Sequence, residues 1–171
     1  MDILLTAMNE SDWPAVAAIF QQGIDTGNAT FEAHPPDSWE MWHKSKIDFS
    51  CLVAREGDTI LGWAALSPYS SRPVYAGVAE VSIYIAEEAR GRGVGSLLLE
   101  ELIRCSEANG IWTLQAGIFP ENEGSLRLHR KHGFRQVGVR ERIGKMSFGP
   151  FQGQWRDTLL LERRSKTVGV D

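Results

Sequence analysis

The 171-residue sequence lacks long apolar runs and clusters of basic residues. It has nothing close to the roughly 18 consecutive apolar residues that suggest a membrane-spanning helix. Its first residues also lack the basic segment and sustained apolar stretch of a secretion signal. The formal net charge is −4, and Lys and Arg form no run of the kind that binds nucleic acid. We therefore expect a soluble, cytoplasmic protein with neither a membrane nor a nucleic-acid partner.

Cysteine is scarce, which limits the kinds of site the chain can build. Its two cysteines, Cys51 and Cys105, lie in a strand-like and a helix-like apolar segment. Such positions favour buried thiols over a disulfide or a metal pair. His129 and His132 could share one helix face, but no convincing third ligand accompanies them. The sequence therefore predicts no metal site.

Repeats, low-complexity stretches and linkers are absent too, and the length suits one domain, residues 1–171, with one core. Alternation, helical periodicity and turn residues predict strands over 3–8, 51–55, 59–66, 79–86, 112–118, 134–140 and 155–162. They predict helices that start after Ser11 or Asp12, run through 39–47, and cover 93–109 and 124–131. The second helix is expected to form one lip of a cleft. This mixed order predicts an α/β layer architecture.

The most informative segment is the glycine loop Ala89-Arg90-Gly91-Arg92-Gly93-Val94-Gly95-Ser96, which joins a predicted strand to a predicted helix. Glycines permit positive φ and a close approach of the backbone to a ligand. The first turn of a helix leaves its N–H groups without intrahelical partners, so a pyrophosphate can bind there. Arg90 and Arg92 would add positive charge, and the Ser96 hydroxyl would add a hydrogen bond.

The spacing of the glycines distinguishes between the known phosphate-binding loops. A P-loop needs a lysine after its last glycine, and here Gly95 is followed directly by Ser96. A dinucleotide fingerprint has glycines at its first, third and sixth positions near the N-terminus, which this loop does not match. Arg90-x-x-Gly93-x-Gly95 does resemble the pyrophosphate arm of the GCN5-related N-acetyltransferases, which bind acetyl-CoA. The alternative is a glycine-rich helix start with no ligand.

A second motif strengthens this resemblance. Asn122-x-x-Ser125-x-x-Leu128-His129-x-x-x-Gly133-Phe134 is similar to the family element in which an asparagine and a helix flank the pantetheine and thiol. An unrelated helix closed by a glycine would explain Gly133 and Phe134 but not Asn122 or Ser125. The chain is thus identified as a member of the superfamily. Membership implies the α/β (α+β) acyl-CoA N-acyltransferase fold, a mixed central sheet with helices on both faces.

Further segments resemble the phosphinothricin and methionine sulfoximine acetyltransferase branch. They are Thr30-Phe31-Glu32, Ser71-Arg72-Pro73-x-Tyr75, Glu80-x-Ser82-x-Tyr84 and Gly153-x-Trp155-x-Asp157. The branch implies acetylation of the α-amine of a small amino-acid analogue of the phosphinothricin, methionine sulfoximine or arsinothricin type, and a homodimer with the substrate site near the subunit interface. The residues expected to bind acetyl-CoA are Ile83, Tyr84, Ile85, Arg90, Gly91, Arg92, Gly93, Val94, Gly95, Ser96, Asn122 and Ser125.

Amide formation requires a neutral amine, a polarised thioester carbonyl and a proton for the leaving thiolate. Glu80 would share a strand face with Ser82 and Tyr84, so we predict that it is the general base; an ordinary salt-bridged carboxylate is the alternative. Backbone N–H groups near Ile83 and Ile85 would bind the thioester oxygen and pantetheine amides if the strand is splayed or bulged, as the resemblance implies.

His129 stands where many of these enzymes place a tyrosine that protonates the leaving sulfur. A histidine can donate a proton near neutral pH, and the alternative is a histidine that only packs beside the cofactor. The residues expected to bind substrate are Phe31, Glu32, Arg72 and Tyr75. The guanidinium of Arg72 would bind the carboxylate or tetrahedral anion, unless it is a solvated loop arginine.

Two other functions stay open at this point. The chain could acetylate another amine, such as a polyamine, an aminoglycoside or a protein N-terminus, although Arg72 argues against a polycationic substrate. Alternatively, it could be a non-catalytic acyl-CoA-binding sensor. The segment Ser70 to Val74 carries a single arginine where some members of the branch carry more, which leaves the anionic group of the substrate open.

Overall fold

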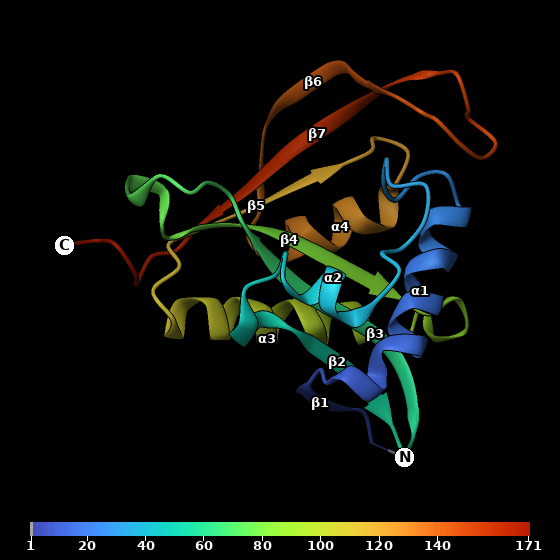
Figure 1. Ribbon diagram of the computed structural model, residues 1–171. Helices are drawn as coiled ribbons and strands as arrows, with labels where there is room; N and C mark the ends of the chain where they lie inside the picture. The colour runs from blue at the N-terminus through green and yellow to red at the C-terminus, as the bar shows by residue number, and fades with distance from the viewer. Residues whose placement is uncertain (1) are drawn as a thin grey trace.

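The computed structural model describes residues 2–171 and contains a seven-stranded sheet with the order β1-β2-β3-β4-β5-β7-β6 (Figure 1). The strands are β1 (Leu4–Ala7), β2 (Leu52–Glu56), β3 (Thr59–Pro68), β4 (Val78–Ile85), β5 (Thr113–Ile118), β6 (Arg135–Lys145) and β7 (Trp155–Arg164). The α-helices are α1 (Trp13–Asp25), α2 (Trp39–His43), α3 (Val94–Ala108) and α4 (Glu123–Lys131). Short 3₁₀ helices cover Glu10–Asp12, Asp48–Ser50, Pro73–Tyr75 and Glu87–Ala89. The predicted order of elements is confirmed.

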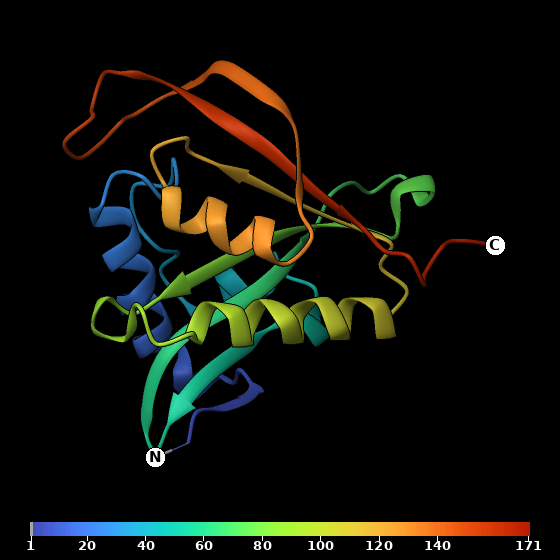
Figure 2. The ribbon, with the colours of Figure 1, turned by 180° about the vertical axis from the view of Figure 1, so that it is seen from behind.

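The sheet is mixed and carries helices on both faces, as expected. β4 and β5 run parallel, and the other neighbouring strands are antiparallel. α1 and α2 cover one face, and α3 and α4 cover the other, as the two opposite views show (Figures 1 and 2). On α3 the predicted core face is confirmed, because Leu98, Leu99 and Leu102 are fully buried. Each leucine buried in this way contributes about 1.5–3 kcal/mol to folding.

α1 begins directly after Asp12, as predicted, but the side-chain cap lies farther upstream. The cap is Asn9, whose Oδ1 accepts a hydrogen bond from the Ser11 N–H at 3.1 Å, while the Asp12 carboxylate accepts one from the Asn9 N–H at 3.0 Å. These two bonds close a 3₁₀ turn ahead of the helix. Neither Ser11 nor Asp12 caps α1 with its side chain, because the extra turn moves the capping position upstream.

α2 is shorter than predicted and does not form a lip of the cleft described below. It begins after Ser38, whose Oγ accepts a hydrogen bond from Met41 N, and it ends at His43. Trp42 turns inward and packs edge-to-face on Trp63 of β3 with 5.4 Å between ring centroids. The apolar face of this segment therefore contributes to the core.

β6 continues beyond its predicted end at residue 140. The β6–β7 register shifts between Arg140 and Gly144, and Arg142 takes a positive φ of 46°. The Asp157 carboxylate accepts a hydrogen bond from the Arg142 N–H at 2.7 Å and fixes this bulge. A bulge interrupts the alternation of side chains, which hid the second half of the strand from the sequence pattern.

Both cysteines are buried free thiols, as predicted. Burial raises the pKa of Cys51 to about 11 and also raises that of Cys105. Across residues 2–171 no helix combines the length and the apolar character needed to cross a bilayer.

Candidate active site

The site is built where β4 and β5 separate. The two strands pair only through Val78–Thr113, Ala79–Leu114 and Glu80–Gln115, whereas β4 stays paired with β3 as far as Ile85. The expected splay of the strand is therefore present. It leaves the last five residues of β4 without a strand partner on this edge.

The hydrogen-bond alternation of β4 shows which N–H groups face the gap. The Ala86 N–H donates to the Leu61 carbonyl at 2.8 Å, on the β3 side. Successive residues of a strand direct their backbone groups to opposite edges. The N–H groups of Ile83 and Ile85 therefore point away from β3, toward the side where β5 has diverged, and are free to bind the carbonyl oxygens of a ligand.

A cleft of about 1110 Å³ occupies this side of β4. Both halves of the chain contribute to its wall. Its lining consists of Gly23, Thr26, residues 28–32, 80–85, 90–91, 116–119, 121–125 and 127–129, and Arg140, Ile143, Gly144 and Thr158. The cleft thus brings together the glycine loop, the start of α4, Glu80 and the segment with Phe31 and Glu32.

The glycine loop has the backbone geometry that its sequence predicts. Gly91 and Gly93 have φ of +79° and +81°, and a Cβ built at either position would meet no atom within 4 Å. Gly93 is the N-cap of α3, so the N–H groups of the first helical turn lack intrahelical acceptors. Arg90 and Gly91 line the cleft. This end of the cleft has the shape and donors that a pyrophosphate needs.

The side chains of three loop residues have other partners in this structure or lie in the core. Arg92 forms an ion pair with Glu56, with 2.6 Å between Nη2 and Oε2. The Ser96 hydroxyl lies within hydrogen-bonding distance of His132 Nε2, at 3.2 Å. Val94 is buried in the core. Like Gly93 and Gly95, these three residues are not among those that line the cleft described above.

Asn122 and Ser125 lie on the opposite wall, at the start of α4. Asn122 Oδ1 accepts a hydrogen bond from Ser125 N at 3.3 Å and caps the helix, while its Nδ2 donates to the Asn28 carbonyl at 3.3 Å. The asparagine therefore has two structural partners before any ligand binds. It ties α4 to the segment that precedes Phe31.

The protonation of His129 follows from its surroundings. Nδ1 lies 2.8 Å from the Ser125 carbonyl oxygen, so we place the proton on Nδ1. The ring is buried, and Nε2 has no partner within residues 2–171. Burial lowers the pKa of His129 below its ordinary value. At neutral pH Nε2 thus carries a lone pair and no proton, which disfavours the expected acid role and favours a histidine that packs beside the ligand.

Glu80 stands at the last β4–β5 pair, on the wall of the cleft. Its Oε2 accepts a hydrogen bond from Gln115 Nε2 at 3.2 Å. Within residues 2–171 no cationic side chain forms an ion pair with Glu80. The described residues therefore do not support the alternative that Glu80 is an ordinary salt-bridged carboxylate. A carboxylate in this position can accept a proton from a group bound in the cleft.

Three aromatic residues, Phe31, Tyr84 and Phe119, line the cleft. Tyr84 stacks on Trp63 with 4.8 Å between centroids, and burial raises its pKa to about 12. A phenol so hard to ionise serves as a wall. Phe31 meets Phe119 edge-to-face at 4.9 Å, and Glu32 lies next to it on the lining.

Arg72 and Tyr75 do not reach the cleft of their own chain. Both are exposed in the connection between β3 and β4, where the Arg72 guanidinium lies 5.4 Å from the centroid of the Tyr75 ring. The structure thus separates these two predicted substrate residues from Phe31 and Glu32. Four residues that the sequence did not single out, Arg140, Ile143, Gly144 and Thr158, line the cleft instead.

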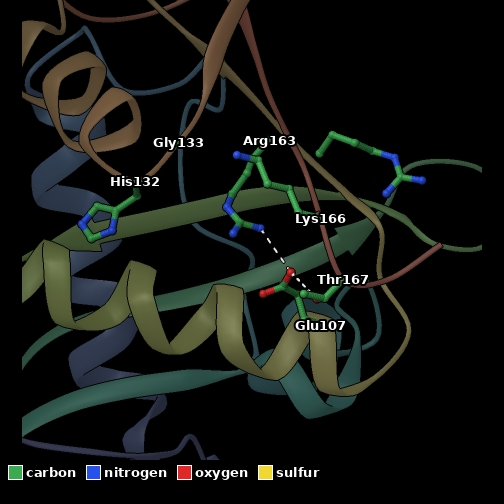
Figure 3. A pocket seen from close by; sticks show the side chains of 7 residues that line it. Glu107, His132, Gly133, Arg163, Lys166 and Thr167 are labelled. Atoms are coloured by element: carbon green, nitrogen blue, oxygen red, sulfur yellow. Dashed lines mark hydrogen bonds and ion pairs between the residues drawn. The ribbon is translucent and has the colours of Figure 1, made fainter. Parts of the chain in front are cut away.

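A second, smaller hollow of about 290 Å³ lies near the C-terminal end of α3 (Figure 3). Glu107, which lines this hollow, forms an ion pair with Arg163, with 3.7 Å between Oε2 and Nη1. The same oxygen accepts a hydrogen bond from the Ser165 hydroxyl at 2.5 Å. The Ser165 hydrogen bond is the main cause of the lowered pKa of Glu107. These contacts fasten the C-terminal tail to α3 and account for its course.

The two histidines at the end of α4 point to different partners. His129 faces Ser125 while His132 faces Ser96, so the pair does not converge. Within the described range 2–171 no group of three or more His, Cys, Asp or Glu side chains could hold a metal ion.

Comparison with known proteins decides the family. The model of the Acetyltransferase (GNAT) family matches residues 13–134. This chain belongs to the GNAT acetyltransferase family. It is an N-acetyltransferase, and it falls in the phosphinothricin/methionine sulfoximine acetyltransferase-like branch, with 27–37% identity to its members over most of the chain.

Three relatives illustrate this membership. The chain is similar to the phosphinothricin N-acetyltransferase of Alcaligenes faecalis, with 37% identity over 91% of this chain and 79% of the relative. It is 27% identical to the L-methionine sulfoximine/L-methionine sulfone acetyltransferase of Pseudomonas aeruginosa, over 89% of this chain and 88% of the relative. Its structure is similar to that of the phosphinothricin acetyltransferase of Sinorhizobium meliloti in complex with acetyl-CoA, with a TM-score of 0.87 and 30% sequence identity. The superposition covers 100% of this chain and 92% of the other.

Proposed function

We propose that this GNAT enzyme transfers the acetyl group of acetyl-CoA to the α-amine of a small amino-acid analogue of the phosphinothricin, methionine sulfoximine or arsinothricin type, and so detoxifies it. The observation that carries the proposal is the position of Glu80 at the β4–β5 split, in the same cleft as the start of the glycine loop and the segment with Phe31 and Glu32. The activities named for the Alcaligenes and Pseudomonas relatives support this substrate class.

The residues around the cleft suit acetyl-CoA. The open space over Gly91 and Gly93 and the first turn of α3 would accept the pyrophosphate, with Arg90 at its side. The free N–H groups of Ile83 and Ile85 would bind the pantetheine and thioester oxygens. The bound acetyl-CoA of the Sinorhizobium meliloti structure supports this assignment.

Glu80 and the free N–H groups of β4 would carry out the main steps of acetyl transfer. Glu80 would take a proton from the substrate ammonium, directly or through a water molecule, and leave an amine that can attack the thioester carbonyl. The open N–H groups of β4 would stabilise the negative charge that develops on the carbonyl oxygen. The new C–N bond would form first, the nitrogen would lose its second proton to solvent, and the C–S bond would break as the carbonyl re-forms. The leaving thiolate would take its proton from solvent, since the unprotonated Nε2 of His129 has none to give.

Arg72 can contribute only from a second copy of the chain, because it lies outside the cleft of its own chain. We therefore propose a homodimer in which the loop carrying Arg72 and Tyr75 closes the amine end of the partner's cleft. The planar guanidinium would then bind the carboxylate or the tetrahedral anion of the substrate. Within one chain, Arg140 is the cation that lines the cleft from β6.

The test is thiol release from acetyl-CoA with a panel of amines. The panel holds phosphinothricin, methionine sulfoximine, an arsenic analogue, ordinary amino acids, spermidine, an aminoglycoside and a peptide with a free N-terminus. We expect turnover with the tetrahedral analogues alone. Turnover restricted to spermidine, the aminoglycoside or the peptide would overturn the substrate, and binding of acetyl-CoA without any turnover would favour the sensor.

A further inference from the structure

Arg156 on β7 is a buried cation that none of the roles above requires. The residue is 5% exposed, and a buried guanidinium is costly unless its donors are satisfied. Two of its three partners, Asn28 and Glu121, line the cleft, and the third, Gly27, directly precedes Asn28. Nη1 donates to the Gly27 carbonyl at 2.8 Å, and Nη2 donates to Asn28 Oδ1 at 2.6 Å and to Glu121 Oε2 at 3.3 Å.

Two aromatic rings fix the plane of this guanidinium. Its central carbon lies 4.2 Å from the centroid of the Phe119 ring and 4.7 Å from that of Phe151. Phe151 also closes the space over Gly27, where an added Cβ would come within 2.8 Å of the ring. A planar cation held in this way offers its donors in one orientation only.

The partners of Arg156 belong to two segments that lie far apart in the sequence and that also meet through the hydrogen bond from Asn122 to the Asn28 carbonyl. Gly27 and Asn28 begin the loop of residues 26–32, which carries Phe31 and Glu32 into the cleft. Glu121 belongs to the turn between β5 and α4 that also holds Asn122. The loop of residues 26–32 has no regular secondary structure, so its position depends on such contacts.

We propose that Arg156 is a positioning residue that holds the loop of residues 26–32 against the β5–α4 turn and thereby sets the amine pocket. The inference rests on the proposed placement of the amine beside Phe31 and Glu32. The fork of the guanidinium supplies the link, because Nη1 fixes the backbone of Gly27 while Nη2 fixes the side chain of Asn28. A lysine can supply the charge, but its single nitrogen cannot reproduce the planar fork that reaches both acceptors.

The first test compares Arg156→Met and Arg156→Lys with the matched control Arg163→Met. Arg163 also lies on β7 and also pairs with a glutamate, but it faces Glu107, away from the cleft. We expect both Arg156 variants to raise the KM for the amine about tenfold or more, the usual effect of losing a hydrogen bond to a charged group. The KM for acetyl-CoA should stay within about twofold, and the control should change neither constant.

A milder variant keeps the proposal testable if the Arg156 variants fold poorly. Asn28→Ala removes the Oδ1 acceptor and leaves the backbone carbonyl that Asn122 uses. We expect it to raise the amine KM in the same direction, and the double variant with Arg156→Met to fall short of the product of the two single effects. The kinetics use whichever amine of the panel is turned over, so a wrong substrate class does not stop the test.

Hydrogen exchange supplies a readout that needs no substrate. In Arg156→Met and in Asn28→Ala we expect faster exchange in peptides that cover residues 26–34, with α3 unchanged. Lower kcat with an unchanged amine KM, faster exchange throughout the chain, or exchange in 26–34 like that of the wild type would overturn the proposal.

Discussion

The two edges of β4 differ although they belong to the same eight residues. On one edge the strand pairs with β3 from Ala79 to Ile85, and on the other it pairs with β5 for only three residues. The closed edge belongs to the core, where Trp63 and Ala64 are completely buried. The open edge carries the cleft. β4 is therefore held rigidly by β3 and still has free N–H donors, because β5 diverges from it after Glu80.

This difference explains why the site is precise without being part of the core. The N–H groups of Ile83 and Ile85 are held by the β3 pairing yet are not used by it. Donors that are fixed in place before the reaction stabilise developing charge with little reorganisation. Glu80 stands at the point where the two edges become different.

The largest expected effect concerns Glu80. Glu80→Gln keeps the hydrogen-bonding shape but cannot take a proton, so kcat should fall about 100-fold or more, as for the loss of a general base. The loss should be greatest at low pH, where more of the amine is protonated. Glu87→Gln, on the exposed turn just after β4, is the control and should behave as the wild type. Wild-type kinetics in Glu80→Gln would remove it from catalysis.

Proline substitution tests the two edges directly. Ser82→Pro removes an N–H that faces Ala65 on the closed edge, and the unpaired acceptor should cost about 1–3 kcal/mol of the free energy of unfolding. Ile83→Pro removes an N–H on the open edge, so it should cost less stability while it raises the KM for acetyl-CoA. Chemical denaturation and steady-state kinetics measure both. Equal destabilisation would show that the open edge is structurally used.

The glycine loop offers a matched pair of smaller changes. Gly93→Ala and Gly110→Ala lie at opposite ends of α3, with φ of +81° and +80° and no atom within 4 Å of the added Cβ. Each should lose about 1–2 kcal/mol of stability from the left-handed backbone. Only Gly93→Ala should also raise the KM for acetyl-CoA, because its methyl group enters the space left for the pyrophosphate. The same KM in both variants would place the pyrophosphate elsewhere.

The smallest effect is the pH dependence contributed by His129. Its pKa is lowered in the folded protein, while in the unfolded chain it lies near 6.5. Between these two values the unfolded chain binds more protons, so this contribution to stability is complete above pH 6.5 and is lost as the pH falls through that value. The wild type should therefore lose more stability between pH 7.5 and 5.5 than His129→Gln does, by at most about 1.4 kcal/mol per pH unit. His34→Gln, at an exposed site, is the control, and equal losses in all three would contradict the burial effect.

Much of this architecture could be read from the sequence, because its signals are local. Periodicity placed α3 and its buried leucines, and the glycines placed the loop with positive φ. The cleft as a whole needed the fold. Arg156 lies 129 residues from Gly27 and 35 from Glu121 in the sequence. Local sequence patterns do not predict contacts over such separations.

Two predicted roles depended on surroundings that the sequence does not contain. The proton of His129 is fixed by burial and by the Ser125 carbonyl, so a motif alone could not decide whether it acts as an acid. Arg72 matches the motif of the branch, yet its position relative to a substrate depends on how a second chain would pack. The bulge of β6, which brings Arg140 and Ile143 to the cleft, broke the alternation on which strand prediction relies.

The β6 bulge lies in a part of the cleft wall that can change independently of β4. Arg140, Ile143 and Gly144 line the cleft from an edge strand, whereas β4 and the glycine loop line the part that we propose for acetyl-CoA. Insertions and substitutions at a bulged edge leave the rest of a sheet in register. A library that varies residues 140–144 should therefore change which amines are acetylated and leave the part proposed for acetyl-CoA unchanged. This short segment is the place to select for activity on new amines.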